Sequence, residues 1–444
     1  MTNRLPFDAP FILAVGIEDT SVGWPLAGSP LGLDEYELTR HYEHWREDLA
    51  RAASLGVTEM RYGFPWYRVN PARGQWDWSW TDAVVDEANR LGIGFIVDLV
   101  HYGTPTWLKG SFTDPAYPEA VAEYAGAVAQ RYRGRLSSIT PLNEPLVTAS
   151  FVGARGIWPP HESGQDGWAR VVVSLAEGIQ RSIKAIRQAA PEMQIVHVEA
   201  THVWEAEPEH DAECELLEHK NYLPTDLVLG RVSAGHAMCG WLLARGIAPD
   251  RLDALAAGAA KPDVIGVNYY PELSARRLAL YGDAVVGVTF NAWTTGLESI
   301  IHAFVDRYGL PVLVSETAVE GDDDHRASWL DDAVALLKTM RAKGVPVLGL
   351  VWWPLFDFVD WSWATGDQVI EEFYARIGGE IMPIHPPTRG KGIDAFFRRM
   401  GLFRLESDGT DIRRVRTRAA DAFMRHARTI GAPAVSTRAP SDAA

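Results

Sequence analysis

The stretch LSSITPLNEP, residues 136–145, decides how the rest of this chain is interpreted. The run 136–142 predicts a short strand, and Pro145 ends that strand at once. Asn143 and Glu144 then place an amide beside a carboxylate at the strand end. This pattern is typical of a carboxylate in a cleft, although Asn-Glu-Pro can also start a helix with a capping carboxylate. Since one carboxylate rarely breaks a stable bond alone, we expect a second one nearby.

Outward from this stretch, short apolar runs alternate with longer amphipathic stretches about eight times. The expected strands are 11–15, 57–62, 94–100, 136–142, 193–198, 264–268, 312–315 and 347–353. The expected helices are 39–55, 80–91, 117–132, 168–188, 297–308 and 324–343, with others around Glu213 and between 233 and 245. Strands that alternate with helices form parallel sheets, and no Gly-rich phosphate loop follows any strand. The pattern therefore predicts an α/β fold, a single (β/α)8 TIM barrel with extended βα loops.

The barrel is expected to span residues 1–431 as one domain. Residues 432–444 are rich in Ala, Pro, Ser and Thr, and we expect them to form a disordered tail. The insertion 366–397 contains several prolines and is interpreted as a long loop after the eighth strand.

Composition excludes several classes of function. A net charge of -16 argues against nucleic-acid or membrane partners, and the basic run 413–418 is interpreted as one face of a terminal helix. The two cysteines and the histidines form no ligand pattern, so we predict no metal and no cofactor. No apolar run is long enough for a signal or a membrane span, which predicts a cytoplasmic protein. The 17 tryptophans exceed what a core needs and suit a cleft that binds sugar rings.

Active sites of such barrels lie at the carboxyl ends of the strands, so functional residues should directly follow the apolar runs. The residues in these positions are Arg61, His101, Tyr102, Asn143, Glu144, Asn268, Tyr270, Glu316 and Trp353. Two of them, Glu144 and Glu316, follow strands four and seven and should face each other across the barrel mouth. Paired carboxylates are what glycoside hydrolysis needs, because one protonates the leaving oxygen while the other attacks the anomeric carbon or activates water. Arg61 and Tyr270 are suitable donors for Glu316.

From about residue 11 to 425 the chain resembles glycoside hydrolase family 1, the β-glucosidase and β-galactosidase family. The family's Asn-Glu-Pro motif is similar to Asn143-Glu144-Pro145, and its Gly-x-Asn-Tyr-Tyr motif to residues 266–270. Its Ile-Thr-Glu-Asn-Gly strand resembles residues 314–318, and its aromatic strand resembles residues 353–361, which end in Trp361.

The resemblance implies roles for these residues. Glu144 would be the general acid/base and Glu316 the nucleophile of a retaining mechanism. Asn143 would hold the 2-hydroxyl and His101 another hydroxyl, while Trp353 would form the floor of the glycone subsite. Trp352 and Trp353 cannot both face the site, because adjacent strand residues point to opposite sides.

Departures from the family pattern concern the outer hydroxyls of the sugar. The family's Gln after strand one is missing, and Glu18 or Asp19 could occupy part of its space. Asp360 stands where the family has a glycone-binding Glu, and Tyr102 stands where it has Trp. We therefore expect the mechanism to be retained and the sugar specificity to be altered.

The resulting hypothesis is a retaining exo-β-glycosidase that removes a terminal sugar from small glycosides or oligosaccharides. The alternatives are an endo-glucanase or a transglycosylase on a related barrel, and a non-catalytic sugar-binding protein. The sequence specifies neither the sugar nor the oligomeric state.

Overall fold

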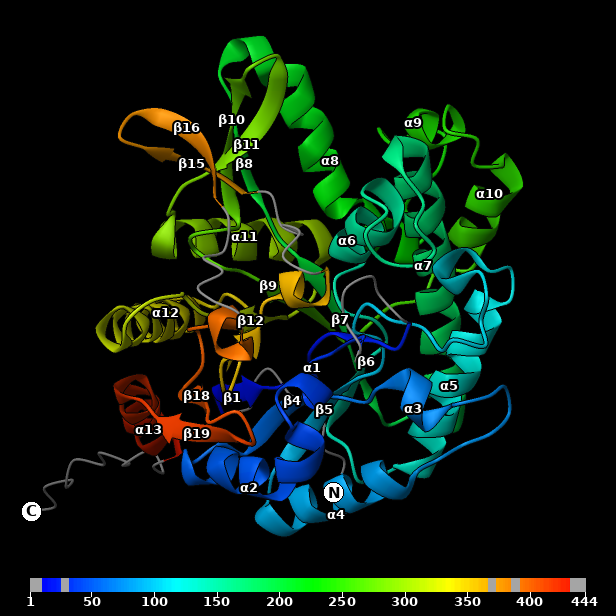
Figure 1. Cartoon of the computed structure of the whole chain (residues 1–444). Coiled ribbons are helices and arrows are strands. Elements are labelled where there is room, and N and C mark those ends of the chain that lie inside the picture. The colour runs from blue at the N-terminus through cyan, green and yellow to red at the C-terminus, as the bar shows by residue number, and fades with distance from the viewer. Residues whose placement is uncertain (1–9, 25–31, 366–372, 385–391, 432–444) are drawn as a thin grey trace, which may run out of the picture.

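The computed structural model describes residues 10–24, 32–365, 373–384 and 392–431. Parallel strands close into a barrel in the order β1-β13-β12-β9-β7-β6-β5-β4, and β1 pairs with β4 to complete the ring (Figure 1). These strands are β1 Ile12–Gly16, β4 Glu59–Gly63, β5 Gly94–Asp98, β6 Ser138–Thr140, β7 Gln194–Ala200, β9 Val264–Asn268, β12 Val312–Thr317 and β13 Val347–Trp352. The (β/α)8 barrel predicted from the sequence is confirmed.

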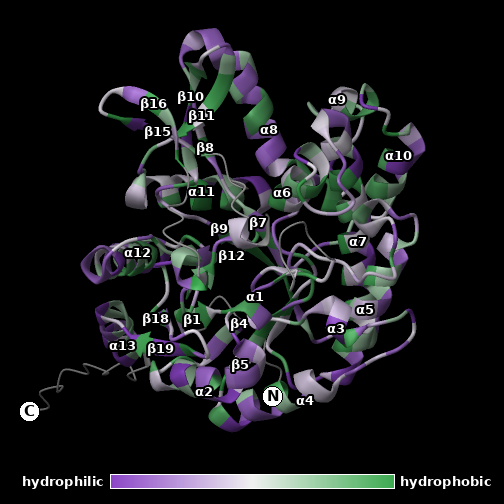
Figure 2. Ribbon diagram, viewed as in Figure 1, coloured by the Kyte–Doolittle hydropathy of each residue, from purple (hydrophilic) through white to green (hydrophobic). Residues whose placement is uncertain are grey.

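Helices between the strands form the outer layer of the barrel. The longer ones are α2 His41–Ser54, α4 Ser79–Leu91, α5 Tyr117–Arg131, α7 Gly164–Ala189, α8 Asp211–Val228, α10 Pro249–Ala257, α11 Trp293–Tyr308, α12 Asp323–Ala342 and α13 Arg418–Gly431. Each forms because an apolar stripe repeats at helical spacing, as in α4, where Val84, Val85 and Ala88 are buried. That helix ends at Gly92, whose φ of 75° few other residues adopt readily. Figure 2 shows hydrophilic residues along the outer sides of α2 and α12.

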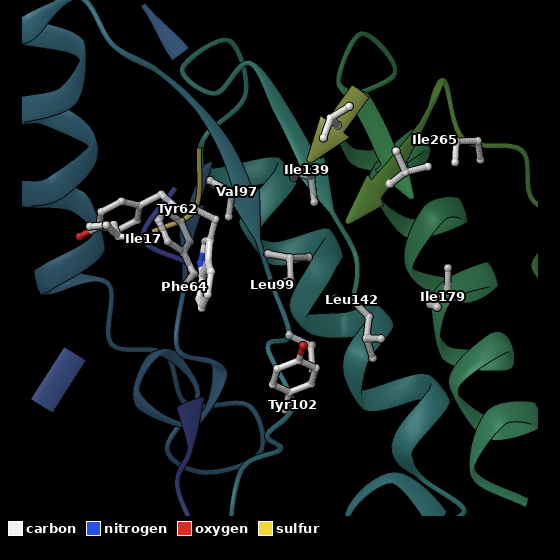
Figure 3. Close-up of a cluster of buried hydrophobic side chains, with 14 of the residues drawn as sticks. Ile17, Tyr62, Phe64, Val97, Leu99, Tyr102, Ile139, Leu142, Ile179 and Ile265 are labelled. Carbon is white, nitrogen blue, oxygen red and sulfur yellow. The ribbon is translucent and has the colours of Figure 1, made fainter. Parts of the chain in front are cut away.

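The core is divided in two by the alternation of side chains along the strands. One buried cluster contains strand residues only, such as Ile12, Ala14 and Leu313, and fills the barrel interior. A larger cluster lies between the strands and the helices, and Figure 3 shows Ile139 and Ile179 among its members. Burial of each such aliphatic side chain contributes roughly 1.5–3 kcal/mol to stability. The interior is therefore packed, which leaves only the strand ends to form a site.

A five-stranded sheet stands outside the barrel, in the order β16-β15-β11-β10-β8. Its strands are β8 Val203–Glu205, β10 Ala275–Tyr281, β11 Ala284–Thr289, β15 Phe373–Ile377 and β16 Glu380–Ile384. The interpretation of 366–397 as a long loop is therefore wrong for 373–384. Gly378 and Gly379 have φ values of 61° and 95°, which allow the two-residue turn that joins β15 to β16. Residues 366–372 and 385–391, like the expected tail 432–444, lie outside the described residues.

The interpretation of the basic run 413–418 as one face of a terminal helix is also wrong. It forms most of strand β19 Ile412–Arg416, which pairs with β18 Phe403–Ser407 ahead of α13. Arg414 is buried and contacts Asp48 of α2 through both Nε and Nη2 at 2.9 Å. The first residues of this strand have the period of two that suits a hairpin, because Ile412 and Arg414 are buried and Arg413 between them is exposed.

Shorter elements connect the barrel units. They are β2 Ser21–Val22, β3 Leu33–Asp34, α1 Glu35–Leu38, α3 Trp66–Val69, α6 Pro145–Thr148, α9 Cys239–Leu243, β14 Phe358–Val359 and β17 Phe397–Arg398. Of the helix expected between 233 and 245, only α9 is present, and α10 was not expected. None of the helices within the described ranges is long and apolar enough to cross a membrane.

Candidate active site

Glu144 lies just beyond β6, at the start of α6. Its φ of 43° is in the left-handed region, which residues other than glycine rarely adopt. The side chain does not cap the helix. Instead, Asn268 Nδ2 donates a hydrogen bond to Oε1 at 2.8 Å and the Tyr102 hydroxyl donates one to Oε2. Backbone strain of this kind is typical of functional sites, because surrounding contacts must impose it.

Glu316 lies in β12, and its carboxylate is held from two sides. Arg61 Nη1 donates to Oε1 at 2.5 Å, and the Tyr270 hydroxyl donates to Oε2 at 2.8 Å. Both predicted donors therefore contact this carboxylate. Glu144 and Glu316 line the same cavity, which has a volume of about 400 Å³. The cavity opens at the carboxyl ends of the strands, as the barrel rule requires.

Arg61 is fully buried and forms part of the floor of this site. Besides Glu316, its guanidinium donates to Glu18 Oε1 at 2.9 Å, to Asp98 Oδ2 at 2.5 Å and to Asn143 Oδ1 at 2.7 Å. A single positive charge therefore contacts three carboxylates, those of Glu18, Asp98 and Glu316. Burial, opposed by Arg61, raises the pKa of Glu18 well above its usual value, with the charges of Glu316 and Asp98 adding to the rise.

The environments of the two cavity glutamates differ in charge. Burial raises the pKa of Glu144 to about 7, the negative charge of Glu316 adds to this rise, and the hydrogen bonds from Tyr102 and Asn268 oppose it. Glu144 has two neutral donors, whereas Glu316 has the guanidinium of Arg61. Glu144 therefore titrates near neutral pH among neutral donors, whereas the Glu316 carboxylate is in contact with a guanidinium.

His101 and Asn143 lie beside this pair. Nδ1 of His101 is 3.2 Å from Asp98 Oδ2, and its Nε2 is 3.2 Å from the Asn143 amide. Burial opposes a charge on His101, but its hydrogen bond to Asp98 and the surrounding carboxylates raise its pKa. Asn143 also donates to the Tyr102 hydroxyl at 3.0 Å.

The structure brings most of the predicted site residues to one cavity. Those that line it are His101, Tyr102, Glu144, Asn268, Tyr270, Glu316, Trp353 and Trp361. Arg61 and Asn143 lie directly beneath and contact the lining residues. Trp352 is fully buried and donates to the Met400 carbonyl, so Trp353 is the member of the pair that faces the cavity.

Two residues predicted to bind substrate or to support the nucleophile, Glu18 and Asp360, are not among those that line the cavity. Glu18 turns toward Arg61, and only its backbone carbonyl reaches the site, where it accepts from Trp353 Nε1 at 2.7 Å. The carboxylate of Asp360 accepts from the Ser362 amide at 2.9 Å and from Arg398 Nη1 at 3.0 Å. Both carboxylates therefore accept hydrogen bonds from neighbouring arginines, Arg61 and Arg398.

Three residues of the site were missed by the sequence analysis. Asp98 is the single charged residue in an otherwise apolar strand, a signal that could have identified it. Glu199, at the end of β7, accepts from the Leu146 amide at 3.0 Å and so holds the start of α6 behind Glu144. Arg398 lines the cavity but follows no barrel strand, so its position in the sequence gave no signal.

Comparison with known proteins identifies the family. The family model described as Glycosyl hydrolase family 1 matches residues 38–368, which is most of the chain. The chain belongs to glycosyl hydrolase family 1. It is therefore a glycoside hydrolase, and its relatives show it to be a β-glycosidase.

Two curated relatives and one solved structure illustrate this membership. Beta-glucosidase A of Thermotoga maritima is 24% identical over 356 residues, covering 72% of this chain and 79% of that protein. Aryl-phospho-beta-D-glucosidase BglC of Bacillus subtilis is 24% identical over 386 residues, covering 74% and 79%. A beta-glucosidase structure from T. maritima in complex with deoxynojirimycin superposes with a TM-score of 0.76 at 18% identity, covering 95% of this chain and 98% of that one. This last likeness supports the fold of this family 1 member.

Proposed function

We propose that this family 1 enzyme is a retaining exo-β-glycosidase with altered specificity for the glycone. The observation that supports it is the pair of cavity carboxylates with opposite environments. Glu144 has a raised pKa and neutral donors, whereas Glu316 contacts a buried guanidinium. Such a split suits one carboxylic acid and one charged nucleophile.

In the first step, a carboxylate oxygen of Glu316 bonds to the anomeric carbon of the sugar while the bond from that carbon to the leaving oxygen breaks. The proton of Glu144 moves to the leaving oxygen, and the aglycone departs as an alcohol. In the second step, the Glu144 carboxylate takes a proton from water as the water oxygen attacks the anomeric carbon. As this bond forms, the bond from the anomeric carbon to Glu316 breaks, which releases the sugar and restores both side chains.

Altered glycone specificity follows from the two carboxylates that turn away from the cavity. Glu18 accepts a hydrogen bond from Arg61. Asp360 accepts hydrogen bonds from Ser362 and Arg398. The outer hydroxyls of a sugar in this cavity would instead meet Trp361, Arg398 and His101. A sugar that differs from glucose at its outer hydroxyls is therefore expected to be the preferred glycone.

The test uses nitrophenyl β-glycosides, including glucosides, galactosides, fucosides, xylosides, uronides and the phosphoglucosides that the name of the B. subtilis relative suggests. Glu144→Ala should lower kcat/KM by about 10²- to 10⁴-fold, because it removes general acid catalysis. Glu316→Ala should abolish turnover. Glu209→Ala, at an exposed glutamate, should leave it unchanged.

Stereochemistry tests the retaining mechanism separately. Proton NMR during hydrolysis should show the β-anomer as the first sugar released. Release of the α-anomer would exclude a covalent ester on Glu316. Oligosaccharides should lose one sugar at a time from the non-reducing end, and release of internal fragments would instead support an endo-acting enzyme.

A further inference from the structure

Two consecutive residues of β7, Val198 and Glu199, contact the segment that begins α6. The Val198 carbonyl accepts a hydrogen bond from the backbone amide of Glu144 at 3.2 Å. Oε1 of Glu199 accepts a hydrogen bond from the backbone amide of Leu146 at 3.0 Å. Helix α6 packs against β7 (Figure 1). The backbone of Glu144 is therefore held from both sides by contacts with the same strand.

The Glu199 side chain points away from the barrel interior. Val196 and Val198 belong to the cluster that fills the interior, and side chains alternate along a strand, so Glu199 lies on the helix side of β7. It is fully buried, and its Oε1 also accepts from the Ala200 amide at 2.9 Å. Glu199 is not among the residues that line the active-site cavity. It can therefore affect the reaction only through other residues.

The contact of Glu199 with Leu146 takes the place of a helix cap. Leu146 is the second residue of α6, and its amide is one of those that a helix leaves without a partner at its start. The side chain of the residue before a helix usually accepts from the amide at this position or the next. In α6 that residue is Glu144, whose side chain makes no such bond. Because Glu199 supplies the cap, the Glu144 carboxyl group can line the cavity instead.

The backbone of Glu144 depends on such support. Its φ of 43° and ψ of 69° lie in the left-handed region, a conformation that persists only where the surrounding structure imposes it. Pro145 fixes the next φ, and the hydrogen bond from Leu146 to Glu199 fixes the position of the first turn. Without the acceptor on Glu199, the Leu146 amide would lose its partner, and the start of α6 would shift together with the Glu144 side chain.

Glu199 provides this acceptor without an ionic partner. Among the residues that the structure describes, its carboxyl group receives hydrogen bonds only from the Leu146 and Ala200 amides, and Oε2 is buried without a partner. Burial raises the pKa of Glu199 well above its usual value, and the negative charge of Glu144 adds to the rise. A neutral carboxyl group still accepts hydrogen bonds. It adds no negative charge beside Glu144.

We propose that Glu199 is a positioning residue for acid/base catalysis, which caps α6 in place of Glu144 and so keeps the Glu144 carboxyl group directed at the leaving oxygen. This inference rests on the proposed function, because it takes Glu144 as the proton donor. Glu199 touches neither the substrate nor the reacting atoms, and no proton passes through it. Its substitution should therefore affect the steps in which Glu144 transfers a proton.

The dependence on the leaving group tests the proposal, with the sugar that the nitrophenyl panel selects. In Glu199→Leu, kcat/KM for the methyl glycoside should fall about 10- to 100-fold, because the proton donor is displaced. The value for the dinitrophenyl glycoside should stay within about twofold of wild type, because this leaving group departs without a proton. Glu199→Met, which also lacks an acceptor but keeps the length of the side chain, should reproduce the loss. An equal loss for both substrates would overturn the proposal, because it would show a general structural effect.

Azide gives a second readout, because it attacks the anomeric carbon without a general base. In Glu199→Leu the second step should be slow, since the displaced Glu144 carboxylate activates water poorly. Azide should then raise kcat for the dinitrophenyl glycoside and yield the β-glycosyl azide, as the bond from nitrogen to the anomeric carbon forms and the bond to Glu316 breaks. Wild type should not respond. A Glu199→Leu variant that azide does not rescue would contradict a role through Glu144.

The conservative variant Glu199→Gln should rescue activity, because its amide oxygen can accept from both backbone amides. The ratio of kcat/KM for the methyl glycoside to that for the dinitrophenyl glycoside should stay within about threefold of wild type. The pH above which kcat/KM falls should also stay the same, because no charge is removed. A shift of this pH to lower values would overturn the proposal in favour of an electrostatic effect of Glu199 on Glu144.

His197→Leu is the matched control. His197 lies on the same side of β7, two residues before Glu199, and its Nε2 is 3.0 Å from the Thr225 hydroxyl in α8. The variant also removes a buried polar side chain, but the ratio of kcat/KM for the two substrates should not change. Urea unfolding should show that both leucine variants are folded under the assay conditions. A ratio that falls equally in His197→Leu would mean that any disturbance of β7 has this effect.

The positioning role and the proposed function can fail separately. If Glu144→Gln hydrolyses the methyl glycoside as fast as wild type, the proposed function fails, and the positioning role fails with it. If Glu144→Gln loses this activity while Glu199→Leu and Glu199→Met keep the wild-type ratio, only the positioning role fails.

Discussion

At the scale of single residues, the site works by giving two identical side chains different neighbours. Tyr102 and Asn268 offer Glu144 neutral donors, and burial raises its pKa to about 7. Glu316 has the guanidinium of Arg61 instead. The positive φ of Glu144 shows that its position is imposed by the surrounding structure rather than by local preference.

The raised pKa predicts the alkaline limb of the activity profile. Glu144 must hold its proton to act as an acid, so kcat/KM for alkyl glycosides should fall about tenfold per pH unit above pH 7. Dinitrophenyl glycosides, whose leaving group needs no proton, should show this fall weakly or not at all. In Glu144→Gln the limb should disappear for every substrate. A limb that persists in this variant would show that another group causes it.

At the scale of elements, apolar runs and amphipathic periods predicted every barrel strand, because strands buried on both faces have an unmistakable composition. The sheet outside the barrel was missed. Its strands β10, β11, β15 and β16 leave most of their side chains partly or fully exposed, and the pairing of β11 with β15 joins segments far apart in the sequence. The run 413–418 was misassigned for a similar reason. Its charge suggested a surface helix, but Arg414 contacts the buried Asp48, which is far away in the sequence.

The candidate site was likewise predictable only in the part that the barrel strands position. Residues that follow barrel strands, such as Tyr270 and Glu316, reached the cavity because strand direction alone puts them there. Glu18 and Asp360 did not, since the direction in which a loop carboxylate points depends on the hydrogen-bond donors around it. Arg398 enters from beyond the last barrel strand, so no rule based on strand ends could have included it.

The C-terminal hairpin of β18 and β19 should depend on the contact of Arg414 with Asp48. Arg414→Met would remove the bidentate partner of the Asp48 carboxylate, which keeps its contacts with Arg51 and His41, so we expect a loss of about 1–3 kcal/mol in the free energy of unfolding. Arg413→Met, on the exposed face of the same strand, should change it by less than about 0.5 kcal/mol. Urea unfolding measures both. Equal effects in the two variants would mean that the buried contact is not what holds the hairpin.

At the scale of the whole molecule, burial raises the pKa of several carboxylic acids in a protein of net charge -16. Burial raises the pKa of Glu35 and Glu199 well above the usual value and that of Asp19 to about 7, as it does for Glu144. These groups hold extra protons in the folded state. Their contribution to stability is therefore present at low pH and is lost as pH rises through the folded pKa values. Buried His197 acts in the opposite sense, since burial lowers its pKa to about 4 and the folded state must exclude a proton.

Glu144→Gln isolates one of these contributions, because glutamine keeps the shape of the side chain and an oxygen that accepts hydrogen bonds. In the unfolded chain the carboxyl titrates near 4.5, and in the folded protein near 7, so as pH rises across that window wild type loses a contribution to stability that the variant lacks. The variant should gain on wild type from pH 5 to pH 8 and be more stable by about 1–3 kcal/mol at pH 8. Thermal unfolding of both proteins at pH 5, 6.5 and 8 measures the difference. A difference that stays constant with pH would mean that Glu144 titrates normally in the folded protein, and its assignment as the proton donor would lose its physical basis.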